Sequence, residues 1–505
     1  MIVLRYDRNS CCYDQYIFYR FRCMKYTTFQ GKLYGGPYRL TIPDELFQNH
    51  YTRKGVCVRM NNKTRMSLVG TGLIALMVVS ACSKEGGSEG SSKTEDKTPF
   101  ELIFYTSDPA GWAQDKFDLV FKEALKQKFP WITVKITSSK TTENPELPAS
   151  VEEYLASGER IDVVLASAGT AYEYVMKNQL QLDISPYIKK YEYNMNRFPD
   201  AIVKQAESMA GSGKGIMGLP FAVAPQALYY NVDIFDKFGV SYPKDGMTWD
   251  DVYQLSKRLN RKEGETQYFG FGFNALHESF LNQWSMPLLD QTTVKSTLDT
   301  NPRWTDWINY FVRFYSDPAY ATLKRSELSW TAEVKRFTHD HTSAMLPTVT
   351  SLYTDIDLQG MKWGVVSHPV FAGTDLGPQP YPQYLFITSM NKHAEDTFQV
   401  LNYLTSEEFQ MQASQKGHFL TSLKDPKIRA AFGQNEPQFQ GKNVQAFWPK
   451  NYADATWIGD LNGSGWGARV SSAMLDVIFN VSDTNTALRK WAEEMNQRVL
   501  TLQGK

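Results

Sequence analysis

The chain has 505 residues, with 54 Lys+Arg, 54 Asp+Glu and 42% hydrophobic residues. The neutral total conceals a split, because residues 1–81 hold 12 Lys+Arg and 4 Asp+Glu, which leaves 42 against 50, a net charge of −8, for residues 82–505. A net acidic body gives no support to nucleic-acid binding, which needs a basic face.

The first 59 residues fit poorly with the rest of the chain. They hold four of the five cysteines, show no sustained hydrophobic period and precede a credible start at Met60 (MNNKTR). We interpret residues 1–59 as an upstream extension from a mistaken start. The alternative is a real N-terminal cytoplasmic segment ahead of an uncleaved anchor.

Residues 60–81 have the layout of a secretory signal peptide. Lys63 and Arg65 precede an apolar run over residues 68–79, and small residues follow it. The run is well short of the roughly 20 residues that a membrane-spanning helix needs. Residues 79–82 (VSAC) also resemble the lipobox of bacterial lipoproteins, in which the cysteine is lipidated. We therefore predict a lipid anchor at Cys82, against the alternative of a plain signal peptide with an incidental cysteine.

A flexible tether is predicted for residues 82–99. Residues 83–98 contain no large apolar side chain, so they bury no surface that would offset the entropy of ordering. A lipid on Cys82 and this solvated segment would hold a folded body at a membrane surface. The body after Cys82 contains no cysteine, which excludes a disulfide framework and a thiol nucleophile.

The body begins with alternating strand and helix patterns that predict an α/β fold. Strands are expected at 100–105, 131–136 and 161–166, and helices at 117–125 and 151–155. A strand, a helix and a strand with short links indicate a βαβ unit and a parallel sheet. Ser167, Ala168 and Gly169 follow the third strand, where ligands of open α/β sheets bind. These small residues either let a ligand approach the backbone or form a tight turn.

Patterns for catalysis and for metal binding are weak. His339 and His341 are the only clustered histidines, and two ligands fall short of a zinc site. A glycosidase needs two cleft carboxylates at a defined separation, which sequence does not place. We expect no enzyme activity, no cofactor and no metal.

Seven segments, in order along residues 100–500, resemble the extracellular solute-binding proteins of family 1, the sugar-binding lipoproteins of ABC transporters that are similar to maltose-binding protein. The match at 218–235 is the most specific. The segments are 157–164 (SGERIDVV), 182–188 (LDISPYI), 218–235 (GLPFAVAPQALYYNVDIF), 248–252 (TWDDV), 363–366 (WGVV), 384–388 (YLFIT) and 394–410.

The resemblance implies two α/β lobes joined by a hinge, with the ligand in the cleft between them. Lobe one is expected at 100–224 plus 384–435, and lobe two at 225–383 plus 436–505. Residues 218–227 would form a hinge strand at the cleft floor, which places Gln226 there. Gln226 either binds ligand or pairs with backbone at the hinge.

The resemblance also implies the other ligand contacts. Trp466 lies in a Gly-rich loop before a helix predicted at 468–480, where the family has an aromatic platform for a sugar ring. Trp284 lies at a position where the family has another aromatic residue in the cleft. Thr348 is a weaker candidate for a ligand contact. Asp108 and Trp112 lie in a ligand loop, although Asp108 also suits a turn or a helix cap.

The function implied is capture of a mono- or oligosaccharide by a monomeric, membrane-anchored extracellular protein, which delivers it to ABC permease subunits. The lipoprotein pattern and the lack of disulfides favour a Gram-positive bacterium. Two alternatives are a surface carbohydrate-active enzyme and a sensory or scaffolding lipoprotein with a degenerate cleft. The loop after Ala166 lacks the charged residues that relatives often carry, which leaves the ligand's identity open.

Overall fold

The computed structural model describes residues 26–33, 36–43, 98–109, 111–142, 144–209, 215–349, 358, 360–456 and 464–503. The chain divides into two units, residues 1–92 and 93–505. In the first unit, β1 (Tyr26–Leu33) pairs antiparallel with β2 (Gly36–Pro43). The predicted signal peptide at 60–81, Cys82 and nearly all of the tether lie outside the described residues. Within the described parts of the chain, none of the helices combines the length and the apolar character needed to cross a bilayer.

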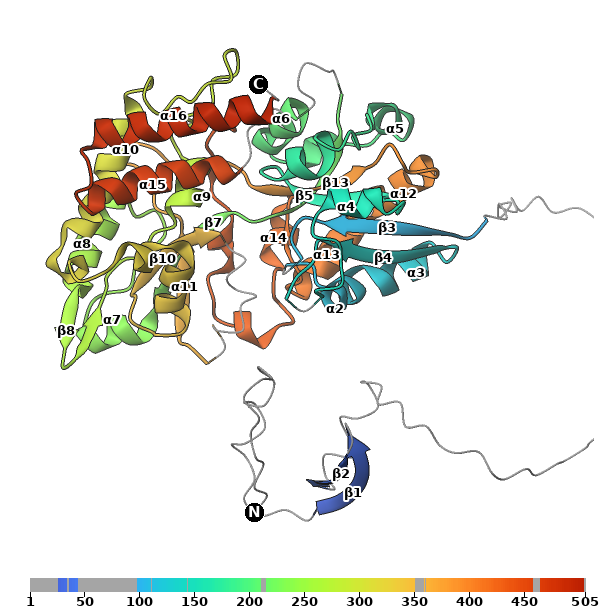
Figure 1. The fold of residues 1–505 in the computed structure, drawn as a ribbon, viewed down its shortest axis with the longest axis horizontal. Helices are drawn as coiled ribbons and strands as arrows, with labels where there is room; N and C mark the ends of the chain where they lie inside the picture. The colour runs from blue at the N-terminus through green and yellow to red at the C-terminus, as the bar shows by residue number, and fades with distance from the viewer. Residues whose placement is uncertain are drawn as a thin grey trace, which may run out of the picture. The chain divides into compact units, whose positions relative to one another are not determined.

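The second unit contains two principal sheets, which with their helices we call lobe one and lobe two. Figure 1 shows lobe one on the right and lobe two on the left. Lobe one has a six-stranded sheet among the described residues, with β3 parallel to both β4 and β5 and with β13 antiparallel to its two neighbours. In sheet order its strands are β14 (Leu420–Thr421), β6 (Gly218–Val223), β13 (Pro382–Ile387), β5 (Val163–Ser167), β3 (Phe100–Thr106) and β4 (Ile132–Ser138).

The sheet of lobe two is three-stranded and antiparallel. Strand β7 (Gln226–Asn231) is central, between β10 (Met345–Val349) and β11 (Trp363–Ser367). Two minor pairs complete the described strands. They are β8 (Arg261–Glu263) with β9 (Thr266–Tyr268), and β12 (Leu376–Gly377) with β15 (Asn451–Tyr452).

Helices cover both sheets. The helices of lobe one are α2 (Gln114–Phe117), α3 (Glu123–Lys128), α4 (Val151–Ala156), α5 (Ser185–Lys190), α6 (Asp200–Ser208), α12 (Ala394–Leu404), α13 (Glu407–Gln415) and α14 (Pro426–Ala430). Those of lobe two are α7 (Val232–Phe238), α8 (Trp249–Leu259), α9 (Ala275–Phe280), α10 (Arg303–Val312), α11 (Trp330–Thr338), α15 (Gly467–Ile478) and α16 (Thr484–Leu502).

Several single-turn helices connect these elements. Two are π-helices, η1 (Asp118–Lys122) and η2 (Tyr172–Met176). The others are 3₁₀-helices, namely η3 (Met195–Arg197), η4 (Arg313–Ser316), η5 (Pro318–Tyr320), η6 (Arg325–Leu328), η9 (Pro437–Phe439), η10 (Val444–Phe447) and η11 (Ser464–Trp466).

The predicted helix at 117–125 is confirmed as helical but not as one α-helix. The chain runs from α2 through the π-helical η1 into α3. Val120 and Phe121 are both buried in the core, whereas Leu119 is exposed. The two buried positions lie three and four residues after the buried Phe117, which is the ordinary spacing of an apolar helix face, so hydrophobic spacing alone did not distinguish the π turn from an α-helix.

The predicted hinge strand at 218–227 is two strands. Strand β6 belongs to the sheet of lobe one, and β7 belongs to the sheet of lobe two. Ala224 and Pro225 make the crossing, where the N–H of Ala224 donates to the carbonyl of Tyr381 at 3.0 Å. Two crossing segments of the chain are therefore bonded to each other between the lobes.

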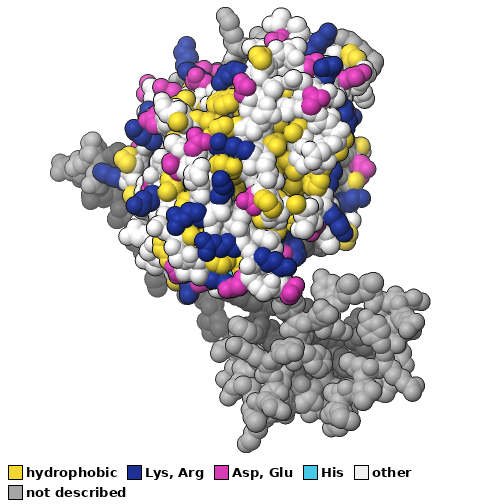
Figure 2. All heavy atoms as spheres, turned by 90° about the vertical axis from the view of Figure 1, so that its left-hand side faces the viewer, with side chains coloured by type: hydrophobic (Ala, Val, Ile, Leu, Met, Phe, Trp, Pro, Cys, Tyr) yellow, Lys and Arg dark blue, Asp and Glu magenta, His cyan; other side chains and the backbone are white. Residues whose placement is uncertain are grey.

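Two large clusters of buried apolar residues form the core. One holds Phe104, Phe121 and Phe221 of lobe one and extends to Tyr229 and Trp363 on the sheet of lobe two. The other lies mainly in lobe two and contains Trp249 and Phe311. Thr248 caps helix α8 in a capping box, because the Thr248 hydroxyl accepts from the N–H of Asp251 at 3.1 Å and the Asp251 carboxylate accepts from the N–H of Thr248 at 2.8 Å. Figure 2 views the end of lobe two, where positive and negative side chains are interspersed around apolar ones.

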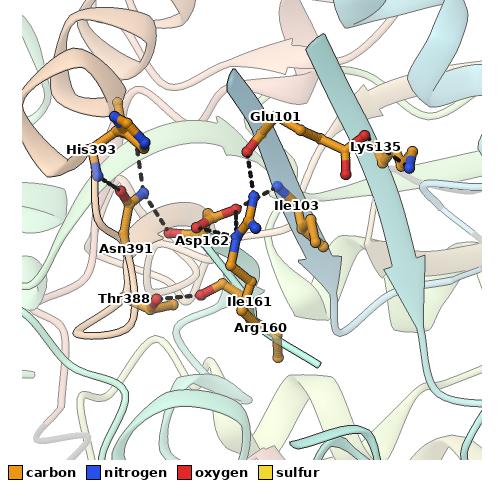
Figure 3. Close-up of polar contacts among 10 residues, drawn as sticks. Glu101, Ile103, Lys135, Arg160, Ile161, Asp162, Thr388, Asn391 and His393 are labelled. Carbon is orange, nitrogen blue, oxygen red and sulfur yellow. Dashed lines mark hydrogen bonds and ion pairs between the residues drawn. The ribbon is translucent and has the colours of Figure 1, made fainter. Parts of the chain in front are cut away.

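Asp162, in the solute-binding-like segment 157–164, joins three parts of lobe one (Figure 3). It is buried at the start of β5, where its carboxylate accepts from the N–H of Ile103 at 2.9 Å and from Nε of Arg160 at 3.1 Å. Its backbone carbonyl accepts from the side-chain amide of Asn391 at 3.2 Å. The Thr388 hydroxyl donates to the neighbouring carbonyl of Ile161. Asp162 thereby fixes β3 and the end of β13 to β5.

We expect Asp162→Ala to lower the free energy of unfolding by about 2–3 kcal/mol, because the N–H of Ile103 loses its acceptor and the Arg160 charge loses its partner. Lys135→Ala is the matched control. Lys135 pairs with Glu101 at 2.8 Å in the same cluster, but its side chain is 68% exposed. Its loss should change stability by less than about 1 kcal/mol. Denaturant unfolding measures both values, and equal effects would contradict this role of Asp162.

Candidate functional site

The carboxyl ends of β3 and β5 lie side by side and carry a chain of hydroxyl groups. Thr170 shares hydrogen bonds of 3.0 Å with Ser107, which follows β3, and with Ser167, which ends β5. The Ser167 hydroxyl in turn donates to Tyr381 Oη at 3.2 Å. The residues directly after β5 therefore lie at the edge of the sheet that faces the crossing between the lobes.

Tyr381 connects this hydroxyl chain to lobe two. It immediately precedes β13, and its ring lies 5.9 Å from that of His277 and 6.0 Å from that of Phe280, both on α9. Helix α9 also supports the start of α15, because a side-chain carbon added at Gly467 would lie 2.4 Å from the carbonyl oxygen of Leu276. Only glycine permits this close approach of the two helices.

A cavity of about 490 Å³ lies between the segment after β5 and the two C-terminal helices. This volume is within the usual range of small-molecule sites. Trp466 forms part of its wall on the side of lobe two, although the ring is only 5% exposed. The lining from lobe one is Gly169, Thr170, Tyr172, Glu173 and Lys177, and that from lobe two is Gly465, Trp466, Arg469, Glu494, Arg498 and Leu502.

The charged groups of the cavity are largely paired. Arg469 and Glu494 form two parallel hydrogen bonds, Nε to Oε2 at 2.7 Å and Nη2 to Oε1 at 3.0 Å. The hydrogen bond from Arg469 holds the pKa of Glu494 below its usual value. Lys177 pairs with Glu152 at 2.7 Å. A flat apolar ring, hydroxyls, backbone groups and compensated charges suit a ligand that is rich in hydroxyl groups and uncharged.

The structure brings some of the predicted site residues together and separates others. Gly169 and Trp466 meet at the cavity, and Ser167 joins the adjoining hydroxyl chain. Ala168 is buried beside them, with its N–H donating to the carbonyl of Pro382 at 3.2 Å. These four positions form one continuous region between the lobes.

Gln226 and Thr348 are buried and lack hydrogen-bond partners. Gln226 is 1% exposed and Thr348 is 0% exposed, and among the described residues no group forms a hydrogen bond with the side-chain amide of the first or with the hydroxyl of the second. Gln226 pairs with Val349 across the strands, and Thr348 with Ala227. Because side chains alternate along a strand, the two polar groups lie on opposite faces of the sheet. Leaving a buried polar group without a hydrogen bond costs roughly 1–3 kcal/mol of folding free energy. Each of these two side chains would therefore be stabilised by a polar partner in another conformation of the protein.

Asp108 and Trp112 have structural contacts. The carboxylate of Asp108 accepts from the N–H of Gly111 at 2.9 Å, which is the turn role that its sequence context also allowed. Trp112 is buried in the core of lobe one, where its Nε1–H donates to Gln383 Oε1 at 3.1 Å and its ring packs on Phe121. Neither residue is among those that line the cavity.

Trp284 lies apart from the cavity lining. Its ring packs on Phe371 at 4.9 Å, and the guanidinium of Arg303 lies 5.3 Å from the ring centroid. Its role as a ligand contact stays a prediction. His339 and His341 are exposed, and within the described ranges no three His, Cys, Asp or Glu side chains gather as metal ligands.

Sequence reasoning missed the groups that surround Trp466 and the strand ends. Thr170 and Ser107 carried no pattern of their own, and Tyr381 is far from both in sequence. Arg469 was missed as well, although helical spacing offered a signal for it, because a residue three positions after Trp466 lies over the preceding turn of a helix.

Comparisons with known proteins agree with this architecture. A family model described as bacterial extracellular solute-binding protein matches residues 121–441. An arabinooligosaccharide-binding protein of Bacillus subtilis (strain 168) is 22% identical over 197 residues, which is 38% of this chain and 41% of that protein. The match thus spans about two fifths of the length of this curated relative.

Two solved structures share the fold. An ABC substrate-binding protein from Listeria monocytogenes in complex with cycloalternan has a TM-score of 0.60 and 18% identity, and covers 80% of this chain and 99% of its own. A sugar transporter from Rhizobium etli in an open conformation has a TM-score of 0.59 and 18% identity, and covers 78% of this chain and 99% of its own. The two-lobed α/β fold is therefore confirmed.

We expect stability to depend on pH through His277. Burial lowers the pKa of His277 to about 4, from its ordinary 6.5. Between these two pH values the unfolded chain binds more protons at His277 than the folded chain does. The contribution of neutral His277 to the free energy of unfolding is therefore fully present above about pH 6.5 and is lost as the pH falls through 4. His277→Gln should flatten the change in melting temperature between pH 7 and pH 4. Parallel profiles for the two proteins would contradict this assignment.

Proposed function

The chain belongs to the bacterial extracellular solute-binding protein family, and from that premise we propose that it captures a carbohydrate and delivers it to the permease of an ABC importer. The observation that carries the proposal is the cavity that joins Trp466 of lobe two to Gly169 and Thr170 of lobe one. The family is one of binding proteins, which agrees with the expectation of a protein that binds its solute without chemical conversion.

Recognition of the sugar is proposed to combine stacking with hydrogen bonds. The accessible part of the Trp466 indole would contact the apolar face of a sugar ring. Thr170 and Ser167 would exchange hydroxyl hydrogen bonds with the sugar, and Gly169 would let it approach the backbone. The sugar-binding functions named for the Bacillus and Listeria proteins support a carbohydrate as the ligand. Ala168, Asp108, Trp112, Trp284, Gln226 and Thr348 remain proposed contacts of lower priority.

Capture would be coupled to closure of the lobes. Ligand binds groups from both lobes, so it stabilises the closed arrangement relative to the open one. A ligand with equal affinity for the open and the closed state would not shift the equilibrium between them. The unmet amide of Gln226, beside the crossing at Ala224, is a group whose hydrogen bonding would change with the hinge.

The location is proposed to be the outer face of a membrane, with a lipid on Cys82, residues 83–99 as the tether and a monomeric body. The signal-peptide pattern at 60–81 and the small residues before Cys82 support the anchor. We also propose a Gram-positive origin.

A thermal-shift screen tests the carbohydrate proposal. The full chain is heated with arabinotriose, maltotriose or cycloalternan, and a ligand that binds only the folded state should raise the melting temperature. The gain corresponds to about 2.7 kcal/mol at a ligand concentration of 100 times Kd. Absence of a shift with all three and with a wider sugar set would favour the sensory or scaffolding alternative.

Trp466→Leu should abolish the shift, because it keeps apolar volume in the wall but removes the flat ring. Trp466→Phe should retain part of the shift. Trp284→Ala determines whether that ring contributes as well. The melting temperatures of the unliganded variants separate lost binding from lost folding. An unchanged sugar shift in Trp466→Leu would contradict the platform role.

Cys82→Ser should release the protein from the membrane fraction into the medium and abolish incorporation of labelled palmitate. The reason is that acylation requires the thiol of Cys82, and a stable anchor requires the acyl chains. Ser88→Ala, in the same tether, is the control and should leave both readouts unchanged. Membrane retention of Cys82→Ser would point to an uncleaved N-terminal anchor.

A further inference from the structure

We infer that the Arg469–Glu494 ion pair is a positioning element that holds the indole of Trp466 in the wall of the cavity. This inference rests on the proposed function, and it adds two residues whose role is to orient the platform. Arg469 lies on the first turn of α15, three residues after Trp466. Its guanidinium carbon is 5.6 Å from the centroid of the indole ring.

Arg469 contacts the residue before Trp466, the indole ring itself and Glu494 on α16. Its Nη1 donates to the carbonyl of Gly465 at 3.3 Å, so it binds the residue immediately before the tryptophan. Its Nε and Nη2 donate to the two carboxylate oxygens of Glu494 at 2.7 and 3.0 Å. A bidentate pair fixes the plane of the guanidinium as well as its position. The cation therefore cannot rotate away from the ring without breaking two hydrogen bonds.

The start of α15 is held from two directions. On one side Gly467 packs against the carbonyl of Leu276 on α9, and the Ser279 hydroxyl donates to the carbonyl of Gly467 at 3.4 Å. On the other side Arg469 reaches Glu494 on α16, which runs beside α15 (Figure 1). Trp466, where η11 meets α15, therefore lies between these two supports.

The exposure of the pair indicates that it acts on position more than on global stability. The side chains of Arg469 and Glu494 are 27% and 42% exposed, and ion pairs at such sites add little to the free energy of unfolding. The hydrogen bond between them raises the pKa of Arg469 and lowers that of Glu494, so both remain charged near neutral pH. A cation over an indole face is favourable when it is partly desolvated.

A second polar cluster on the same two helices offers a matched control. Asp476 on α15 is buried, and its carboxylate accepts from Lys490 Nζ at 2.9 Å, from Trp491 Nε1 at 2.9 Å and from Arg325 at 2.8 Å. Lys490 and Trp491 are on α16, so this cluster also joins the two helices. Its members do not line the cavity. Lys490→Met removes one donor from the helix pair without touching Trp466.

The test measures affinity in a double-mutant cycle. Arg469→Met and Glu494→Gln are expected to weaken binding of the best probe among arabinotriose, maltotriose and cycloalternan about tenfold, which is the scale of a partly desolvated cation–π contact with its ion pair. Arg469→Lys should recover only part of the loss, because it lacks the planar fork. Lys490→Met should leave the affinity unchanged. In a Trp466→Phe background, which retains measurable binding, Arg469→Met should cost less affinity than in the wild type, because the smaller ring gives the guanidinium a weaker contact.

Two results would overturn the inference. One is an equal loss of affinity from Lys490→Met, which would mean that Arg469 acts only through the stability of the helix pair. The other is an undiminished effect of Arg469→Met in the Trp466→Phe background, which would mean that Arg469, itself in the cavity lining, contacts the ligand directly.

A readout without ligand separates this inference from the proposed function. Acrylamide quenching of the Trp466 contribution, taken as the difference between each protein and its Trp466→Phe form, should rise in Arg469→Met and stay unchanged in Lys490→Met. If no probe binds the wild type, the carbohydrate proposal fails while this measurement still decides the positioning role. Unchanged quenching in Arg469→Met would overturn the role even if a sugar binds.

Discussion

The structure depends on strand β13, which returns from lobe two and pairs on both sides in the middle of the sheet of lobe one. Residues 382–387 lie between β5 and β6, and they are antiparallel to both. The parallel strands of the N-terminal half therefore gain their partner β13 only after the part of lobe two from β7 to β11 has been inserted in sequence. The second crossing, at Ala224, is bonded to Tyr381 beside the start of β13. These two crossing segments are hydrogen-bonded to each other, and together they connect the two lobes.

That placement explains why the cavity draws on distant parts of the sequence. The strand-end residues Gly169 and Thr170 come from the first quarter of the body, whereas Trp466 and Arg469 come from its last helices. Their side chains meet because β5 ends where the crossings begin, and because α15 starts against α9 through the contact of Gly467 with Leu276. The polar groups in this region are joined in chains, with Ser107, Thr170, Ser167 and Tyr381 on one side and Arg469 with Glu494 on the other.

Buried polar groups in this protein fall into two kinds. Asp162 and Asp476 have their carboxylates saturated by donors from different elements, and they join strands or helices permanently. Gln226 and Thr348 are equally buried but have unmet side chains next to the hinge. A buried polar group whose hydrogen bonds are all made specifies one packing arrangement of the elements that it joins. A buried polar group without a hydrogen bond favours a conformation in which it finds a partner.

The sequence by itself determined the α/β class, the first three strands and the first helices of lobe one, and the position of Trp466 before a helix, because these follow from local periodicity. It determined where the candidate ligand residues lie along the chain, but not which of them share a site. Only the tertiary structure decided that Trp112 belongs to a core, that Asp108 closes a turn, that Trp284 packs on Phe371, and that Gly169 meets Trp466. Local patterns report which side of an element is apolar. The neighbours of a side chain depend on how the elements cross and pack, and that arrangement is set by contacts between residues hundreds of positions apart.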